Sequence, residues 1–359
     1  MKILFLGNAQ IIHTRRWVQY FANAGHEVHL ISLTSSFVSM DNVHYHEVKK
    51  TPLRILNIVS LVRKVKKIIK SIKPEVLHVH YAGMYGLVGS LSGFHPFVLT
   101  AWGSDILIAG QSGLTSTLVK FVLNKADLIT CDADHMVDVM LKLGVEHSKI
   151  KFINFGVDTN KFYPKKQNDS LKYKLGIDNS PVIISLRMLE PLYDIGTLIK
   201  AVPSVLEKIP SITILIAGTG PQEEELKKMA TSLVVMESVK FLGFISNDEL
   251  PQYLNIANVY VSTSTSDAGI ACSTAEAMSC GLPVITTDFG ANGDWIVDGK
   301  GGFVVPIKNP KMLAEKIIYL INNPEKSKRF GQMNQSIIKV RNDYHIEMKK
   351  MEDWYFKVK

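Results

Sequence analysis

The chain has 359 residues, of which 46% are hydrophobic and 21% are charged. This length exceeds what one hydrophobic core usually supports and predicts two domains, while the composition excludes a disordered chain, a collagen-like repeat and a membrane-spanning bundle. Lysine and arginine number 41 against 33 acidic residues, and the formal charge of +8 favours anionic partners such as nucleotide phosphates, anionic lipid or nucleic acid, without choosing among them.

The cysteines and the first residues indicate the compartment. Cys131, Cys272 and Cys280 are too few and too irregularly spaced for a disulfide framework, and no CxxC pair suggests zinc. The apolar start is too short for a secretory signal, and no run of about 18 apolar residues follows. We therefore expect a cytoplasmic protein that does not cross a membrane.

Short β-branched runs recur along the chain at intervals wide enough for a helix between them. In the first half they cover residues 2–6, 27–31, 76–81, 97–102, 127–130 and 151–155. In the second half they cover residues 182–186, 212–217, 239–242, 259–263, 284–287 and 303–305. Such runs predict buried parallel strands that alternate with helices, so the same α/β pattern occurs twice.

The segment from Lys49 to Lys73 has nine lysines or arginines and no acidic residue, and its isoleucines and valines repeat at spacings of three and four. This pattern predicts an amphipathic helix with a basic outer face. Such a face is either solvated or in contact with an anionic membrane surface, and the first is favoured until a lipid acceptor is shown. No aromatic residues interleave with the basic ones, so we expect no nucleic-acid partner.

A polar segment broken by proline, residues 162–170, separates the two series of strands. We place the boundary there, which gives an N-terminal domain over residues 1–165 and a C-terminal domain over 166–337. Residues 338–359 are expected to form a helix that packs on the N-terminal domain, with Met348, Met351 and Trp354 on its apolar face.

Polar side chains after the strands of the first domain are candidate ligands, because open parallel sheets bind ligands at the carboxyl ends of their strands. Asp105 can accept hydrogen bonds from sugar hydroxyls, and His80 can donate or accept one near neutral pH. For His80 and His13 a role in the core is at least as well supported. The Gly-x-Gly-x-x-Gly fingerprint is absent after the first strand, which weakens a dehydrogenase interpretation.

The strand ends of the second domain are more specific. Arg187 directly follows a predicted strand, where its charged fork can bind a diphosphate. Gly218 and Gly220 follow the next strand and allow close approach of the backbone to a ligand.

A serine-rich loop then leads into a helix expected to begin near Ser273, with Glu276 in its first turn. This helix start can hold a phosphate and Glu276 the ribose hydroxyls, or the two residues form a capping box, and the local pattern leaves both open.

Asp132 and Asp134 have the Asp-x-Asp spacing with which some enzymes bind a divalent metal. Their position at a predicted helix start favours capping instead. We expect neither a metal nor a separate cofactor.

Four short motifs of this sequence occur in the same order as in retaining glycosyltransferases of family 4, and the chain resembles that family over most of its length. They are NFGVDTNKFYP at 154–164, FLGFIS followed by EL within 241–250, EAMSCGLPV at 276–284 and DGKGGFVVP at 298–306. The resemblance implies the GT-B fold, in which two Rossmann-like domains face each other across a cleft.

The resemblance also implies that the second domain binds a nucleotide sugar, a UDP- or GDP-sugar, and that the first holds a glycan or lipid-linked acceptor. It implies transfer with retention of anomeric configuration, by a hexosyltransferase of cell-surface polysaccharide, glycolipid or glycoprotein assembly. The alternatives are a sugar-nucleotide epimerase or other GT-B enzyme, and a catalytically silent nucleotide-sugar binding protein. The expected catalytic residues are Asp267, Arg187, His80 and Asp105. The expected donor-binding residues are Arg187, Gly218, Gly220, Phe244, Ile245, Ala268, Gly269, Ile270, Ser273, Thr274 and Glu276.

Three departures from the family pattern stand beside the resemblance. The usual first glutamate, eight positions before Glu276, is Ala268, with Asp267 one position further away. Leu192 replaces the lysine that normally follows the arginine by five residues, and Trp102 stands where many members have a histidine. These positions limit which family roles carry over.

Overall fold

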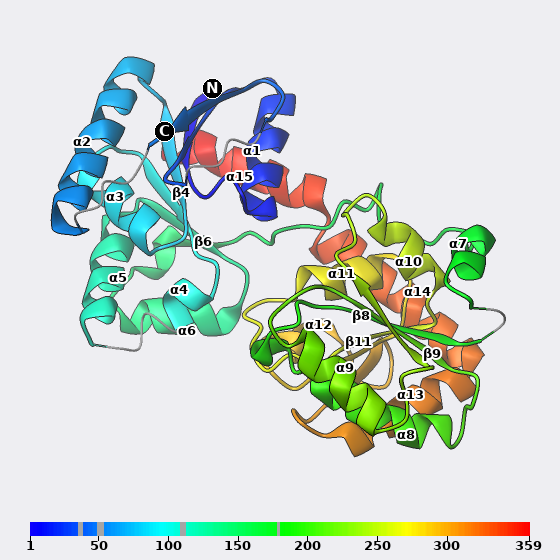
Figure 1. Ribbon diagram of the computed structural model, residues 1–359. Coiled ribbons are helices and arrows are strands. Elements are labelled where there is room, and N and C mark those ends of the chain that lie inside the picture. Colours follow the sequence, from blue (N-terminus) through cyan, green and yellow to red (C-terminus); the bar gives the residue numbers. More distant parts are fainter. Residues whose placement is uncertain (35–38, 49–53, 108–112, 178–179) are drawn as a thin grey trace. The chain divides into compact units, whose positions relative to one another are not determined.

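The chain forms two units, each built around one parallel sheet (Figure 1). The computed structural model describes residues 1–34, 39–48, 54–107, 113–177 and 180–359. Unit 1 comprises Met1–Phe155 together with His345–Lys359, and unit 2 comprises Gly156–Tyr344.

Unit 1 contains a seven-stranded sheet within the described residues, in the order β3-β2-β1-β4-β5-β6-β7. Its strands are β1 (Lys2–Leu6), β2 (Glu27–Ser32), β3 (Val43–Glu47), β4 (Val76–His80), β5 (Phe97–Thr100), β6 (Leu128–Cys131) and β7 (Ile150–Phe152). Strands β1, β2 and β3 lie side by side in chain order, and β4 then pairs with the other edge of β1. The order of the strands therefore reverses between β1 and β4.

The helices of unit 1 cover both faces of this sheet (Figure 1). They are α1 (Ile12–Asn23), α2 (Arg54–Ile72), α3 (Met84–Ser92), α4 (Ser104–Leu107), α5 (Gly113–Lys125), α6 (Asp134–Lys142) and α15 (Tyr344–Val358). Helices α2, α3 and α5 contact one another in that order, while α1 packs beside α15. This is the doubly wound arrangement that alternating strands and helices predict.

Unit 2 contains a six-stranded parallel sheet within the described residues, in the order β10-β9-β8-β11-β12-β13. Its strands are β8 (Val182–Leu186), β9 (Thr213–Ala217), β10 (Val239–Gly243), β11 (Val259–Ser262), β12 (Val284–Thr287) and β13 (Gly302–Val305). Here the reversal lies between β8 and β11, which pair directly. The prediction of two Rossmann-like domains is confirmed.

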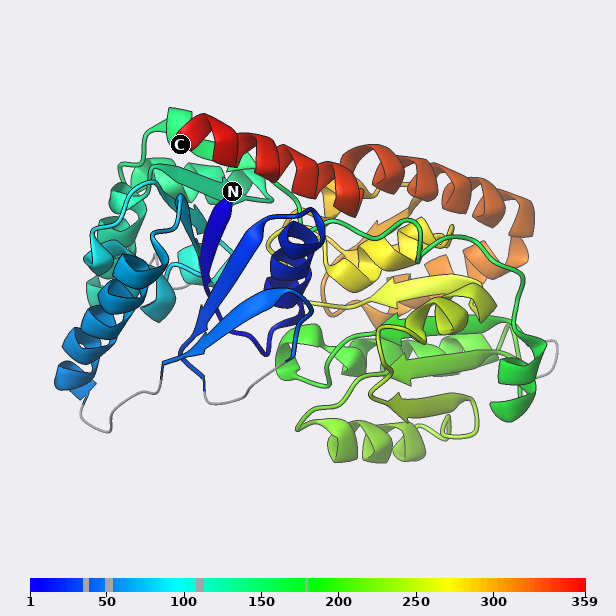
Figure 2. The same cartoon turned by 90° about the horizontal axis from the view of Figure 1, so that it is seen from above.

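Two layers of helices enclose the second sheet (Figures 1 and 2). They are α7 (Asp169–Lys174), α8 (Ile195–Leu206), α9 (Glu223–Ser232), α10 (Leu250–Ile256), α11 (Cys272–Ser279), α12 (Asn292–Trp295), α13 (Pro310–Asn322) and α14 (Pro324–Arg341). Helix α8 packs between α9 and α13, and α11 packs on α14. A buried aliphatic core under α8, α9 and α13 holds this layer to the strands.

The unit boundaries differ from the predicted ones. The chain first passes from unit 1 into unit 2 after Phe155, ten residues before the predicted boundary, because Val157 already pairs in parallel with Asp343 inside unit 2. Helix α14 continues unbroken past residue 337 and belongs to unit 2, so the return to unit 1 is the start of α15.

Helix α15 is fixed to the unit 1 sheet by buried polar contacts. The Tyr355 hydroxyl bonds His78 Nδ1, and His78 Nε2 lies 2.7 Å from Thr100 Oγ1, which lies 2.7 Å from Thr130 Oγ1. Met348, Met351 and Tyr355 are fully buried. The packing predicted for the C-terminal helix is confirmed, with Tyr355 in the role expected of Trp354.

The basic segment is helical from Arg54 to Ile72, and residues 49–53 lie outside the described part of the chain. Its apolar residues Leu61, Val65 and Ile72 are buried, whereas its later cations face solvent. None of the helices in the described part of the chain is both long and apolar enough to span a bilayer.

Candidate functional site

Arg187 and Asp267 meet at the point in unit 2 where the order of the strands reverses. Arg187 follows β8, and Asp267 lies in the loop after the neighbouring strand β11. The Arg187 Nη2 and Asp267 Oδ1 atoms are 2.5 Å apart. Crevices at such reversal points are where open α/β sheets bind their ligands, so this ion pair marks the candidate site.

Arg187 is a buried cation with several partners. Its Nη2 donates to Ser264 Oγ at 3.3 Å, and its guanidinium carbon lies 4.2 Å from the centroid of the Tyr193 ring. Burial alone lowers the pKa of Arg187, but the negative charge of Asp267 and its other neighbours outweigh burial and raise that pKa above its ordinary value. The site therefore carries a permanent positive charge that Asp267 balances.

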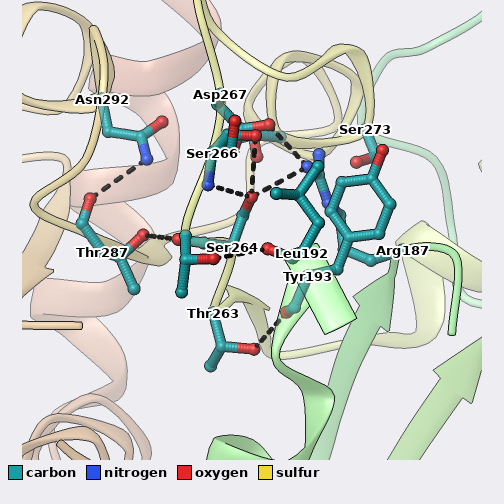
Figure 3. A network of polar contacts seen from close by, with 12 residues as sticks. Arg187, Leu192, Tyr193, Thr263, Ser264, Ser266, Asp267, Ser273, Thr287 and Asn292 are labelled. Carbon is teal, nitrogen blue, oxygen red and sulfur yellow. Dashed lines mark hydrogen bonds and ion pairs between the residues drawn. The ribbon is translucent and has the colours of Figure 1, made fainter. Parts of the chain in front are cut away.

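Backbone and hydroxyl contacts hold the loop after β11 against the loop after β8 (Figure 3). Thr263 Oγ1 donates to the Tyr193 carbonyl at 3.0 Å, and Thr265 N donates to the Leu192 carbonyl at 2.8 Å. On the other side, Thr287 Oγ1 donates to the Ser264 carbonyl at 2.5 Å. Leu192, which lacks the family's usual charge, thus anchors the loop through its backbone.

Two polar atoms of the ion pair are buried without a partner among the described residues: Arg187 Nε and Asp267 Oδ2. Buried polar atoms in folded proteins are nearly always paired, and an orphaned one calls for an explanation. A ligand that offers an anionic oxygen to Arg187 and a hydroxyl to Asp267 satisfies both. Phosphate and sugar supply these groups.

Two glycines after β9 allow the backbone there to pack closely against the backbone after β8. A Cβ on Gly218 would lie 2.1 Å from the Arg187 carbonyl oxygen, and one on Gly220 would lie 2.4 Å from the Leu189 carbonyl oxygen. Leu189 N also donates to the Thr219 carbonyl at 3.0 Å. The close approach expected at these glycines is therefore made to the backbone that follows β8, and a ligand contact there stays a prediction.

The helix after the loop differs in register from its prediction. Helix α11 begins at Cys272 with Ala271 as N-cap, and no side chain caps it. The expected start near Ser273 is confirmed to within one residue, but the capping box is wrong, because Ser273 Oγ instead lies 2.8 Å from the hydroxyl of the buried Tyr260. Glu276 lies in the second turn rather than the first and is 7% exposed.

The other predicted donor residues divide into buried and accessible ones. Gly269, Ile270 and Thr274 are buried. Ala268 is half-buried, and its carbonyl accepts from Ala291 N at 3.2 Å.

Phe244 and Ile245, expected beside the base, differ sharply in exposure. Phe244, just beyond edge strand β10, is 80% exposed, whereas Ile245 is 9% exposed. Only the Phe244 ring is available to stack on a base, and Ile245 packs within the unit.

Asp105 in unit 1 does not have the role expected of it. Its Oδ2 accepts from Ala82 N at 2.7 Å and its Oδ1 from Trp102 N at 3.0 Å, and the residue is 1% exposed. The carboxylate therefore fastens the loops after β4 and β5 to each other instead of receiving sugar hydroxyls.

His80 ends β4 in unit 1 and is 3% exposed. Burial, together with the neighbouring His13, lowers the pKa of His80 to about 3. Burial and then Arg16 lower the pKa of His13 to about 4. Both imidazoles are uncharged at neutral pH. His13 packs between aromatic rings, with its centroid 4.6 Å from that of Phe155 and 5.7 Å from that of Trp102.

The Asp-x-Asp pair also departs from its prediction. Asp134 is the first residue of α6, but the N-cap is Ala133 and no side chain caps the helix. Burial raises the pKa of Asp132 to about 7. In the described part of the chain, no group of three or more His, Cys, Asp or Glu residues is arranged to hold a metal ion.

Tyr193, Ser264 and Tyr260 are the site residues that sequence reasoning missed. Tyr193 ends the short 3-10 helix Pro191–Tyr193 that comes after Arg187, and Ser264 is the second residue after β11. The position of Ser264 just past a strand was the available signal. Nothing local indicated that the Tyr193 ring stacks on Arg187.

Both units match known protein families. Residues 167–336 match the family described as glycosyl transferases group 1, and residues 2–133 match the family described as glycosyl transferase 4-like. The two matches together span most of the chain.

Similar curated proteins come from several bacteria. The GDP-mannose-dependent alpha-(1-6)-phosphatidylinositol monomannoside mannosyltransferase of Mycolicibacterium smegmatis is 26% identical over 222 residues, covering 60% of this chain and 58% of that protein. The N-acetyl-alpha-D-glucosaminyl L-malate synthase of Bacillus anthracis is 22% identical over 341 residues, covering 91% and 88%. The chain spans 53% of the spore coat protein SA of Bacillus subtilis, so several of these matches cover little more than half of the relative.

Among solved structures, Anabaena Alr3699/HepE in complex with UDP-glucose has a TM-score of 0.84 and 22% sequence identity, and the match covers 99% of this chain and 100% of that one. This likeness shows a shared fold.

Proposed function

This chain belongs to the glycosyl transferases of group 1, and we propose that it moves a hexosyl group from a nucleotide sugar to a glycan or lipid-linked acceptor. The product belongs to cell-surface polysaccharide, glycolipid or glycoprotein assembly. We expect transfer with retention of anomeric configuration, because the family that the chain resembles is a family of retaining enzymes.

The observation that carries this proposal is the buried Arg187–Asp267 pair at the strand reversal of unit 2, with one unpartnered atom on each residue. In the proposed complex Arg187 Nε donates to the diphosphate, and Asp267 Oδ2 accepts from a hydroxyl of the donor sugar. Negative charge grows on the diphosphate as the bond to the anomeric carbon breaks. A fixed guanidinium in a site shielded from water stabilises that charge more in the transition state than in the ground state.

The remaining donor contacts extend from this pair. The carboxylate of Glu276 is proposed to hold the ribose hydroxyls, and the exposed ring of Phe244 to stack on the base. The first turn of α11, which no side chain caps, offers backbone N–H groups to phosphate. We propose UDP or GDP as the nucleotide, since the mycobacterial relative is named for GDP-mannose and the Anabaena structure contains UDP-glucose.

We also propose that α2 brings this enzyme to the cytoplasmic face of an anionic membrane. Arg63, Lys64, Lys66, Lys67 and Lys70 are exposed along the helix. Near such a surface each basic residue contributes about 1 kcal/mol. Sedimentation with vesicles of phosphatidylglycerol tests this, and Lys66→Glu/Lys70→Glu is expected to abolish it. Lys328→Glu/Arg329→Glu on α14 makes the same charge change and is expected to retain binding, whereas equal loss in both variants would contradict a role of α2.

Thermal unfolding with a panel of nucleoside diphosphates and nucleotide sugars tests the proposed function. A ligand that binds only the folded state at 100 times its Kd stabilises it by about 2.7 kcal/mol. We expect one nucleotide to raise the unfolding temperature, and its sugar to appear on an acceptor in a mass-spectrometric transfer assay. Binding without transfer to any of a broad acceptor set would favour the silent binding protein, and conversion of the donor without an acceptor would favour an epimerase.

A further inference from the structure

Unit 2 contains a pocket of about 480 Å³ at the amino ends of three neighbouring strands. Pro181, Asn258 and Pro283 line it, and they directly precede β8, β11 and β12. Its volume lies within the range of about 300–1,000 Å³ that is usual for small-molecule sites. Arg187 and Asp267 follow the carboxyl ends of β8 and β11, so this pocket is distinct from the candidate donor site.

The backbone that borders the pocket is largely satisfied by contacts within unit 2. The carbonyl oxygens of Pro181, Leu282 and Pro283 accept hydrogen bonds from neighbouring segments at 2.9, 2.8 and 3.1 Å. The prolines of the lining have no N–H to donate. The side chains therefore decide what an occupant meets.

Two amide side chains of the lining, those of Asn258 and Gln167, are oriented by partners that can only donate. Asn258 Oδ1 accepts from Val182 N at 2.7 Å, and Gln167 Oε1 accepts from Lys172 Nζ at 2.6 Å. Because a backbone N–H and an ammonium group accept nothing, each amide oxygen must face its partner. In the part of the chain that the structure describes, neither amide nitrogen has an acceptor, so both remain as donors.

Lys328, in the first turns of α14, adds a positive charge to the lining. It is exposed and forms no ion pair or hydrogen bond with the described residues. Ser327 Oγ donates its single hydrogen to the Leu320 carbonyl at 2.6 Å and can offer an occupant only an acceptor. Among the described lining residues there is no aspartate or glutamate. The pocket therefore presents mainly donors and a positive charge.

Much of the remaining lining is aliphatic. Leu282 and Leu320 are buried, Ile321 is half-buried, and Pro324 lies beside them in the lining. An inorganic ion would leave this apolar surface in contact with water, whereas an aliphatic group would cover it at a gain of about 25 cal/mol for each Å². The lining thus favours an occupant that has both an anionic and an aliphatic part.

We propose that this pocket binds a small oxyanion carried on an aliphatic body, either a phosphate monoester or a carboxylate. Its anionic oxygens accept from Lys328 and from the amide nitrogens of Asn258 and Gln167, and hydrogen bonds between charged groups are the stronger ones. A cationic occupant would meet Lys328 without a carboxylate to balance it. The proposal does not depend on the proposed function, because neither Arg187 nor Asp267 lines this pocket.

Calorimetric titration of the full chain with four probes tests the ligand class. The probes are n-hexyl phosphate and hexanoate, compared with inorganic phosphate and n-hexanol. At least one of the two anionic hexyl probes is expected to bind at least tenfold more tightly than both comparison compounds, and the one that binds identifies the head group. Equal binding of hexanol would overturn the anionic class, and equal binding of inorganic phosphate would mean an adventitious ion only. No binding of any probe would overturn the pocket.

Two variants test the donors of the lining. Asn258→Asp keeps the oxygen that accepts from Val182 N but replaces the amide nitrogen with a negatively charged oxygen. Lys328→Met removes the charge and keeps a long side chain. Each is expected to weaken binding of the hexyl probe at least tenfold, and wild-type affinity in both would overturn the assignment.

Matched controls make the same chemical changes outside the lining. Asn309→Asp retains the oxygen that accepts from Met312 N at 3.0 Å at the start of α13, and Arg329→Met neutralises the residue next to Lys328. Both controls are expected to bind the hexyl probe as the wild type does. Equal weakening in a control and in its pocket variant would show a general effect of charge and overturn the site.

A phosphate probe can also bind at the donor site, so the titration is repeated with Arg187→Met/Asp267→Leu. Unchanged affinity of the hexyl probe in this variant is expected. Loss of affinity there, with none in Lys328→Met, would place the probe at the donor site and overturn the pocket. A wild type that binds the hexyl probe but no nucleotide would support the pocket and count against the proposed function alone.

Discussion

Replacing one member of the Arg187–Asp267 pair leaves the other as an isolated buried charge. The Nη2–Oδ1 distance is 2.5 Å, and the two side chains are 8% and 10% exposed. Removal of one partner from such a pair costs about 3–5 kcal/mol, whereas replacement of both by apolar residues of similar volume is often neutral. Arg187→Met and Asp267→Leu are each expected to lose that amount, and the double variant is expected to be more stable than either.

Hydrogen exchange measured by mass spectrometry on peptides covering β8 and β11 is the suitable assay, because it reports the opening free energy of unit 2 alone. A matched cycle of wild type, two single variants and the double variant isolates the coupling between the residues. If both single variants remain within about 1 kcal/mol of wild type, or the double variant loses the sum of both, the pair does not balance a buried charge as argued.

Three further predictions concern unit 1 and the reaction. Tyr355→Phe leaves His78 Nδ1 buried without its partner and is expected to cost about 1–3 kcal/mol, measured by hydrogen exchange of β4; exchange at the wild-type rate would show that the contact contributes nothing. The stability of unit 1 is expected to fall as pH drops from about 6.5 towards 4, because in the folded chain the pKa of His80 is about 3 and that of His13 about 4, each lowered from 6.5 by burial. As the pH falls, the unfolded chain therefore binds protons before the folded chain does, and the free energy of unfolding falls by up to about 1.4 kcal/mol for each pH unit and each histidine. Denaturant unfolding measured over a series of pH values tests this. An unfolding free energy that does not change with pH would contradict the burial of both histidines as neutral rings. EDTA is expected to leave sugar transfer unchanged, since no metal is proposed, and loss of transfer restored by Mg²⁺ or Mn²⁺ would overturn that expectation.

The strands that carry the sites could be predicted because they are buried on both faces. Such strands are continuous β-branched runs, and β8 and β12 have the predicted bounds. Strand β3 was missed because it is an edge strand with the sequence VHYHE, which has no apolar run and is only partly buried. Arg187 could be found because it directly follows a recognisable strand.

The features that could not be predicted from the sequence depend on contacts between residues that are far apart in the chain. The early crossing into unit 2 follows from pairing between Val157 and Asp343, which are far apart in the chain. The two hydrogen bonds that occupy Asp105 come from backbone groups of separate loops. The left-handed backbone of Tyr81 is imposed by its neighbours and contradicts the local preference of a tyrosine.

Calorimetric titration of nucleoside diphosphates and nucleotide sugars into wild type and the Arg187→Met/Asp267→Leu variant tests the central claim, that this pair forms the donor site. The double variant is the appropriate comparison because it is expected to fold without an isolated buried charge. The account predicts that one nucleotide binds the wild type and binds the variant at least tenfold more weakly. Equal affinity for both proteins, or no binding by a wild type shown to be folded, would contradict it.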